Sequence, residues 1–173
     1  MKNKVVLITG SAKGIGKAIA KELAKNGYDI VINYLHSKQE ALSLQKELIA
    51  LYGVNVLAMQ ADVSSVEQVD AMVNEIEDKM GGVDVLVNNA AIDLSNLFHL
   101  KTSEEFQKTM NVNVVGAFNC AKRVSHHMME KEYGRIINIS STNGMNTYYP
   151  MSIDYDVSKA ALNALTHDLA MQW

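Results

Sequence analysis

TGSAKGIG, at residues 9–16, decides the fold of this chain. The stretch follows the apolar run Val5–Ile8, and continuous apolar residues are typical of a parallel strand that is covered on both faces. It opens a helical pattern in which Ile15, Ile19 and Leu23 recur every four residues. Glycines between a strand and a helix let a pyrophosphate reach backbone N–H groups at the positive end of the helix. The stretch therefore predicts the first strand, turn and helix of a dinucleotide-binding fold.

Strand-like and helix-like segments alternate along the rest of the chain. Apolar runs at residues 30–32, 54–58, 83–87 and 136–139 predict further buried strands. Another helix face is marked by Val66, Val69, Val73, Ile76 and Met80, after a possible cap at Ser64 or Ser65. Alternation of this kind produces right-handed βαβ units. We therefore expect a single α/β domain over residues 1–173, a Rossmann-type doubly wound parallel sheet with helices on both faces.

The spacing of the glycines limits the kind of phosphate site. It is G-x-x-x-G-x-G, which differs from the more familiar G-x-G-x-x-G, and Lys17 is followed by Ala18 rather than by the hydroxyl of a P-loop. Three glycines alone could form only a tight turn, but their place in the first strand–helix connection favours dinucleotide binding. We expect cofactor contacts from Gly10, Ser11, Lys13, Gly14, Ile15 and Gly16.

The end of the second strand predicts which cofactor binds. An acidic residue there would bind the ribose hydroxyls of NAD and repel the extra phosphate of NADP. Here the strand ends in Asn33 and Tyr34, with no carboxylate, and Lys13 adds a positive charge beside the loop. We therefore predict NADP(H) in preference to NAD(H), although Lys13 could equally be a solvated loop residue.

A tyrosine and a lysine four residues apart predict acid–base chemistry. Tyr155 and Lys159 lie in a helical run, where such residues share a face. A tyrosine hydroxyl titrates near pH ~10, and a nearby ammonium lowers that pKa, so the hydroxyl can exchange a proton with a carbonyl or alcohol. Ser141 follows the fifth strand, where its hydroxyl could bind the substrate oxygen. Tyr34 and Lys38 have the same spacing, but no helix has started there.

Taken in order, these motifs resemble those of the short-chain dehydrogenase/reductase family, over all 173 residues. Residues 9–16 match the cofactor loop. Asp62-Val63 match the pair that contacts adenine, and Asn88-Asn89-Ala90-Ala91 match Asn-Asn-Ala-Gly with Ala91 in place of the last glycine. Asn113 falls at the position of the family's fourth catalytic residue, beside Ser141, Tyr155 and Lys159.

The resemblance implies a role for each matched residue. Tyr155 would be the general acid/base, Lys159 would lower its pKa and bind the nicotinamide ribose, and Ser141 would orient the substrate oxygen. Asn113 would hold a water that relays protons through Lys159. Asp62, Val63, Asn89 and Ala90 would line the cofactor. The helices at residues 114–131 and 155–173 would form a subunit interface, which implies a homo-oligomer, a tetramer or a dimer.

The substrate is less determined than the chemistry. The pattern is most similar to that of 3-oxoacyl-(acyl-carrier-protein) reductases, which implies an acyl-thioester substrate. The segment at residues 129–133, however, reads MEKEY and is less inviting to an acidic carrier protein. A small ketone, a sugar or another alcohol is the alternative. A non-catalytic dinucleotide sensor would typically lose the tyrosine or lysine, and a sugar-nucleotide epimerase would usually carry G-x-x-G-x-x-G.

The chain ends 14 residues after Lys159, at Trp173. The resemblance implies that further strands, a loop over the nicotinamide and a substrate lid would follow, so we expect a domain that is C-terminally incomplete relative to the family. We expect no turnover from these 173 residues alone.

Composition excludes several other functions. The formal net charge of −3 gives no electrostatic case for nucleic acid or an anionic membrane. No apolar run approaches the ~18 residues that span a membrane, and no signal-peptide pattern opens the chain. Cys120 is the single cysteine, which fits a core position in a cytoplasmic protein. Adjacent helical residues such as His126-His127 do not converge, so we expect no metal site.

Overall fold

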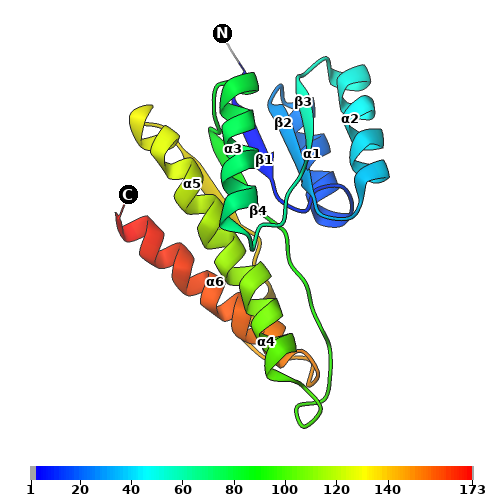
Figure 1. The fold of residues 1–173 in the computed structure, drawn as a ribbon, viewed down its shortest axis with the longest axis vertical. Helices are drawn as coiled ribbons and strands as arrows, with labels where there is room; N and C mark the ends of the chain where they lie inside the picture. The colour runs from blue at the N-terminus through cyan, green and yellow to red at the C-terminus, as the bar shows by residue number, and fades with distance from the viewer. Residues whose placement is uncertain (1–2, 173) are drawn as a thin grey trace.

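A computed structural model describes residues 3–172 of the chain. Its centre is a five-stranded, wholly parallel sheet in the order β3-β2-β1-β4-β5 (Figure 1). The strands are β1 (Val5–Ile8), β2 (Asp29–Tyr34), β3 (Val56–Gln60), β4 (Val85–Asn88) and β5 (Arg135–Asn138). The predicted parallel, doubly wound sheet is confirmed.

Six α-helices connect and cover the strands within the described residues. They are α1 (Gly14–Lys25), α2 (Lys38–Tyr52), α3 (Val66–Met80), α4 (Ser103–Met110), α5 (Gly116–Glu130) and α6 (Ile153–Gln172). Helices α1 and α2 lie on one side of the sheet, with α3, α5 and α6 on the other, and α4 and the start of α6 extend beyond its edge (Figure 1).

Alternate strand residues build two separate cores. Val6, Ile8 and Ile30 pack with Ala20 of α1 and Leu44 of α2. On the opposite face, the core combines strand residues with α3 and α5 and is made by Val5, Leu7, Val31, Leu86, Val69, Ile76, Cys120 and Val124. Because both faces are buried, the strands carry the continuous apolar runs that identified them in the sequence.

The helix termini are set by caps and glycines. The Ser65 hydroxyl accepts from the backbone N–H of Gln68 and begins α3, while Gly53 and Gly81 adopt left-handed conformations where α2 and α3 end. The predicted apolar face of α1 needs correction. Ile15 is 65% exposed, whereas Ile19 and Leu23 are partly buried and pack against the core as predicted. The fully buried stripe of α1 is made of Gly16, Ala20 and Ala24, which have little or no side chain.

Helices α4 and α5 are joined by a π-helical turn rather than by a loop. Thr102 begins α4 with a capping box, in which its side chain accepts from Glu105 N and the Glu105 carboxylate accepts from Thr102 N. The π turn Asn111–Val115 then continues into α5. A π turn inserts one extra residue into the helical repeat, and such turns are frequent at functional sites.

The final helix starts earlier than the sequence predicts. Thr142–Gly144 form a 3₁₀ turn, and α6 begins at Ile153, two residues before the expected start of this helix at residue 155. Trp173 lies outside the described residues. Within the described part of the chain, no strand pairs with the outer edge of β5, where Ile137 is exposed.

Candidate active site

The neighbouring strands β1 and β4 leave the sheet toward opposite sides, which makes their carboxyl ends the switch point of the fold. Side chains tie these two ends together. The Thr9 hydroxyl accepts hydrogen bonds from the backbone N–H groups of Asn89 and Ala90, both at 3.0 Å. In return, the Asn89 amide donates to the carbonyls of Thr9 at 2.9 Å and Gly10 at 3.2 Å. The loop after β1 is therefore held by the residues after β4.

The glycines of this loop are needed for two different reasons, backbone conformation and space. Gly10 and Gly14 have φ values of +62° and +60°, which few other residues adopt. Gly16 is needed for space, since a Cβ there would lie 2.6 Å from the Asn89 amide nitrogen and 2.8 Å from Ser11 Cα. The Ser11 hydroxyl is buried and donates to the Ile8 carbonyl at 2.7 Å, so its side chain faces inward rather than toward a ligand.

Asn33 is an organising residue of the loop. Its side chain is 2% exposed. The Oδ1 atom accepts from Gly10 N at 3.1 Å, and Nδ2 donates to the Ala61 carbonyl at 3.0 Å. One amide therefore links the ends of β1, β2 and β3.

A cleft of about 1060 Å³ opens over these strand ends. Eight of the predicted cofactor residues line it, namely Gly10, Lys13, Asn33, Tyr34, Asp62, Val63, Asn89 and Ala90. The other predicted cofactor residues lie outside its lining, namely Ser11, Gly14, Ile15, Gly16, Tyr155 and Lys159. Leu35, His36 and Ser37 also line the cleft, together with Gln107 and Lys108 of α4, and sequence reasoning missed them. The first three directly follow the second strand, and that position could have identified them.

The Asp62-Val63 pair is held rigidly at the side of the cleft. The Asp62 carboxylate accepts from the backbone N–H of Ser64 at 2.9 Å and from its hydroxyl at 2.6 Å. Val63 is buried, and its carbonyl accepts from the Asn119 side chain of α5 at 3.1 Å. A Cβ at Gly116 would lie 2.6 Å from the Val63 side chain, so α5 supports this wall of the cleft at close range.

Tyr155 and Lys159 lie on one face of α6, as the spacing predicts. The Lys159 ammonium is 5.4 Å from the centroid of the Tyr155 ring. It donates to the carbonyl of Ile139, just beyond β5, at 2.7 Å. Lys159 is 3% exposed, and burial lowers the pKa of its ammonium because the charged form loses solvation.

Ser141 is brought to α6 by the turn that follows β5. Its hydroxyl accepts from Asn143 N at 3.2 Å, and the Asn143 side chain donates to the Asp156 carboxylate at 2.7 Å. Gly144 packs directly on the helix, because a Cβ there would lie 2.8 Å from the carbonyl carbon of Lys159. The 3₁₀ turn is thereby fixed against the first two turns of α6.

Asn113 lies in the π turn and joins the same cluster. Its Oδ1 accepts from Ile92 N at 2.8 Å, while Nδ2 donates to the Ile92 carbonyl and to the Ser158 hydroxyl, both at 2.9 Å. The Ser158 hydroxyl in turn donates to the Tyr155 carbonyl. Both amide hydrogens of Asn113 are therefore used within the protein.

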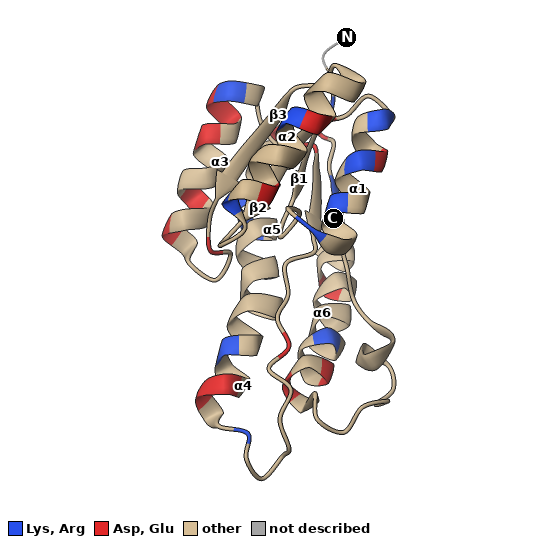
Figure 2. Ribbon diagram, turned by 90° about the vertical axis from the view of Figure 1, so that its right-hand side faces the viewer, with Lys and Arg blue, Asp and Glu red and all other residues tan. Residues whose placement is uncertain are grey.

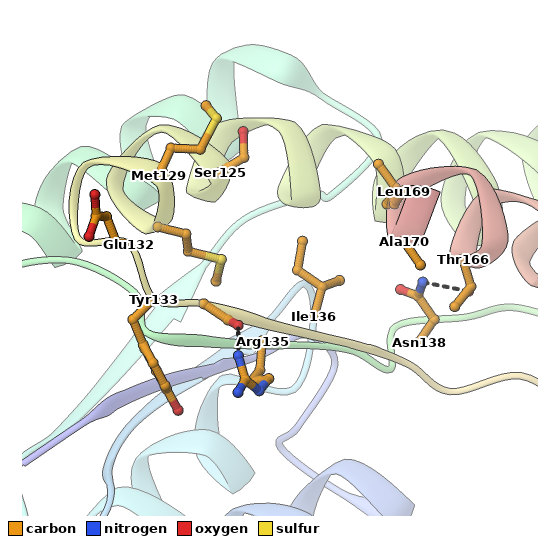
Figure 3. Close-up of a pocket in the computed structure, with 12 residues that line it drawn as sticks. Ser125, Met129, Glu132, Tyr133, Arg135, Ile136, Asn138, Thr166, Leu169 and Ala170 are labelled. Atoms are coloured by element: carbon orange, nitrogen blue, oxygen red, sulfur yellow. Dashed lines mark hydrogen bonds between the residues drawn. The ribbon is translucent and has the colours of Figure 1, made fainter. Parts of the chain in front are cut away.

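A second cavity, of about 500 Å³, lies along β5 between the ends of α5 and α6 (Figure 3). Met129, Ile136 and Leu169 line it, and the Asn138 amide donates to the Thr166 hydroxyl at 2.9 Å on one side (Figure 3). None of the predicted site residues lines this cavity.

Other features of the described residues offer no competing site. No group of three or more metal-binding side chains occurs in residues 3–172, and no helix there could cross a membrane. Burial raises the pKa of the Cys120 thiol to about 12, as expected for a core cysteine. Figure 2 shows Lys and Arg interspersed with Asp and Glu on the helices, with few charges on the strands.

The sequence also matches a family model for short chain dehydrogenases over residues 4–173. The chain belongs to the short-chain dehydrogenase family. It is therefore an oxidoreductase that acts on CH–OH donors, and nicotinamide nucleotides are the cofactors of its family. The predicted resemblance is confirmed.

Several short-chain dehydrogenases are similar over nearly the whole chain. The 3-oxoacyl-[acyl-carrier-protein] reductase FabG of Staphylococcus aureus is 37% identical over 98% of this chain and 68% of its own length. The 3beta-hydroxysteroid dehydrogenase 1 of Eggerthella lenta is 37% identical over 100% of this chain and 66% of its own. A gluconate 5-dehydrogenase from Burkholderia cenocepacia, solved with NADP and tartrate, has a TM-score of 0.91 at 33% identity and covers 100% of this chain and 67% of its own. This chain thus spans about two thirds of the length of these relatives.

Proposed function

We propose that this chain is the dinucleotide-binding domain of an NADP(H)-dependent enzyme that interconverts a carbonyl and a secondary alcohol. The observation that carries the proposal is the buried Lys159 ammonium beside Tyr155, on a helix that packs against α4 and the π turn, both of which line the cofactor cleft. A buried ammonium beside a phenol would stabilise the negative charge that forms when Tyr155 gives its proton to a substrate oxygen.

Each residue of the cluster has a defined task in the proposed reaction. When bound, the nicotinamide supplies or accepts the hydride. Tyr155 gives its hydroxyl proton to the carbonyl oxygen during reduction and takes it back during oxidation. Ser141 donates a hydrogen bond to that oxygen as charge develops on it. Lys159 stabilises the phenolate, and a water on the Asn113 carbonyl would return the proton from solvent through Lys159.

The preference for NADP(H) rests on charge around the β2 end of the cleft. No carboxylate lies among the residues that follow β2 there, which are Leu35, His36 and Ser37. The exposed Lys13 lies on the opposite loop. A 2′-phosphate would meet the Lys13 ammonium and the Ser37 hydroxyl, whereas NAD(H) would gain no acidic partner for its ribose. The gluconate 5-dehydrogenase relative was solved with NADP, whereas a xylitol dehydrogenase with a TM-score of 0.92 and 31% identity was solved with NAD+, so the preference rests on the charges of this cleft.

Two substrate classes are supported by different observations. The relatives that are named 3-oxoacyl-[acyl-carrier-protein] reductases favour an acyl thioester. An acidic carrier protein would bind to free basic residues, but basic residues around the end of α5 already contact other side chains. Lys131 pairs with Asp84 at 3.2 Å, and Lys4 and Arg135 lie over the Tyr133 ring. A small ketone or sugar therefore remains the second candidate.

We also propose that the chain assembles into a homo-oligomer through α5 and α6. Val115, Phe118 and Val157 are large apolar residues that these segments leave exposed. Apolar exposure on adjoining helices is typical of a subunit interface. Light scattering would test it, because Phe118→Glu is expected to lower the molar mass to that of a monomer.

Two experiments test the proposed function. The first measures the cofactor preference, and the second separates an enzyme from a dinucleotide sensor. Thermal unfolding with NADPH at about 100 times its dissociation constant should add ~2.7 kcal/mol of stability, and NADH at the same concentration should add less. Equal shifts, or a larger one with NADH, would refute the cofactor preference. In the enzyme at the full length of its relatives, replacing Tyr155 by Phe should abolish turnover while leaving the NADPH shift. A variant with no turnover but unchanged biological function would favour a sensor.

A further inference from the structure

The segment between β4 and α4 is fastened to the start of α6 along its whole length. Ile92 is bound by Asn113, whose amide also reaches Ser158 of α6. Further on, Asp93 accepts from the Ser152 hydroxyl at 2.9 Å, and Asn96 N donates to the carbonyl of Met151 at 2.8 Å. This segment directly continues the Asn89-Ala90 pair, so it connects the cofactor cleft to the helix that carries Tyr155.

The last of these fastenings is a buried ion pair. The Lys101 ammonium lies 3.0 Å from the Asp154 carboxylate, and the two side chains are 4% and 0% exposed. The second carboxylate oxygen accepts from the Thr109 hydroxyl at 2.6 Å, and Lys101 also donates to the Leu94 carbonyl. Three segments therefore meet at one carboxylate, which are the β4–α4 segment, α4 and the first turn of α6.

Stability alone is a poor explanation for this pair. The free energy lost by removing two charges from water offsets much of the free energy gained from their attraction. Proteins in which such a pair is replaced by apolar residues of similar volume are often as stable. Directional contacts add something that apolar packing lacks, because each hydrogen bond specifies an orientation as well as a distance. Burial would raise the pKa of the Asp154 carboxyl, but the hydrogen bonds from Thr109 and Lys101 outweigh it and lower that pKa, so the carboxylate stays charged.

We propose that Asp154, held by Lys101 and Thr109, is a positioning residue that fixes Tyr155 relative to the cofactor cleft. Asp154 immediately precedes Tyr155 in the first turn of α6, so its orientation sets the direction in which the tyrosine leaves the helix. The proposal rests on the role given above to Tyr155. Lys101, Thr109 and Asp154 lie outside the predicted site, and together they would keep that tyrosine in a fixed orientation.

The test replaces the cluster by apolar residues in the intact protein. Asp154→Leu alone leaves the Lys101 charge buried and should lower the melting temperature strongly. The triple variant Lys101→Met, Thr109→Val, Asp154→Leu should recover most of that loss, since no charge remains unpaired. A matched control is Lys21→Met with Glu47→Leu, which removes the more exposed pair between α1 and α2.

We expect the triple variant to melt near the wild-type temperature and to bind NADPH equally well, while kcat falls at least tenfold and KM changes little. Amide hydrogen exchange in residues 153–158 should be faster. The control double variant should change neither kcat nor this exchange rate. Recovery of wild-type kcat together with the melting temperature would overturn the proposal, because the cluster would then be structural only.

A milder variant covers failure of the triple variant to fold. Asp154→Asn keeps an acceptor for Thr109, and it too should lower kcat without changing KM. Hydrogen exchange makes this test independent of the proposed chemistry. If the wild-type enzyme at the full length of its relatives turns over no carbonyl substrate, the proposed function fails, and unchanged exchange in residues 153–158 would separately overturn the positioning role.

Discussion

Gly16→Ala should destabilise this protein, although it places alanine within a helix. On helix propensity alone, the substitution would stabilise α1 by about 1 kcal/mol. The new Cβ, however, would lie 2.6 Å from the Asn89 amide nitrogen and 2.8 Å from Ser11 Cα. Asn89 could swing away only by giving up its hydrogen bonds to Thr9 and Gly10, and the second contact is to backbone, which cannot rotate aside.

The size of the effect follows from these contacts. Two lost hydrogen bonds cost about 0.5–1.5 kcal/mol each, and crowding a packed site costs about 1–3 kcal/mol more. After the gain in propensity, we expect a net loss of about 3 kcal/mol, which lowers the melting temperature by roughly 6–12 °C in a chain of this size.

Thermal unfolding of the free protein would measure this loss. Ala18→Gly, on the exposed face of α1, is the matched control and should cost only about 1 kcal/mol, which calibrates propensity in the same helix. A Gly16→Ala protein as stable as the wild type would refute the reasoning, since it would show that the β1–α1 loop can yield without loss.

Three further predictions concern charge and reactivity. Lys13→Gln should weaken NADPH binding about fivefold and leave NADH binding unchanged in fluorescence titrations, since only the 2′-phosphate loses a partner; equal weakening of both would contradict the assignment. Cys120, whose thiol pKa is raised to about 12 by burial, should resist iodoacetamide at pH 8 and react only in denaturant, as mass spectrometry would show. The bidentate hydrogen bond from Arg123 lowers the pKa of the Glu77 carboxyl, so its stabilisation is present above about pH 4.3 and is lost as the pH falls below it. Glu77→Gln should therefore lose about 1 kcal/mol at pH 7 and almost none at pH 3 in urea unfolding.

The sequence predicted the strands well because both faces of the sheet are buried. Val5–Ile8 matches the observed β1, whereas the third strand starts at Val56, two residues later than expected. The reason is local, since the N–H of Asn55 donates to the side-chain carboxylate of Asp29 rather than to a backbone carbonyl of β2. Apolar runs indicate which segment is a strand, but a side chain from another segment decides where its ladder begins.

The site was predictable where one motif contains its own chemistry, and less so where distant polar residues meet. Lys159 lies beside Tyr155 as the four-residue spacing requires. By contrast, Lys101 and Asp154 are 53 positions apart, and each alone reads as a surface charge. Asn33 was expected to contact the cofactor, yet both ends of its amide are used within the protein. Only the packed structure shows which polar groups have partners.

The π turn Asn111–Val115 makes the length of this segment matter more than its composition. Because of this turn, one continuous helix makes two separate side-chain hydrogen bonds, which act as anchors. Thr109 binds the Asp154 carboxylate, and Asn119 binds the Val63 carbonyl. Deleting one residue would restore a regular helix and rotate one end about 100° against the other. At most one anchor could then be kept. Substitutions within residues 111–115 would therefore be tolerated far more readily than a deletion. In related chains, we expect the number of residues between the two anchors to be the same as here.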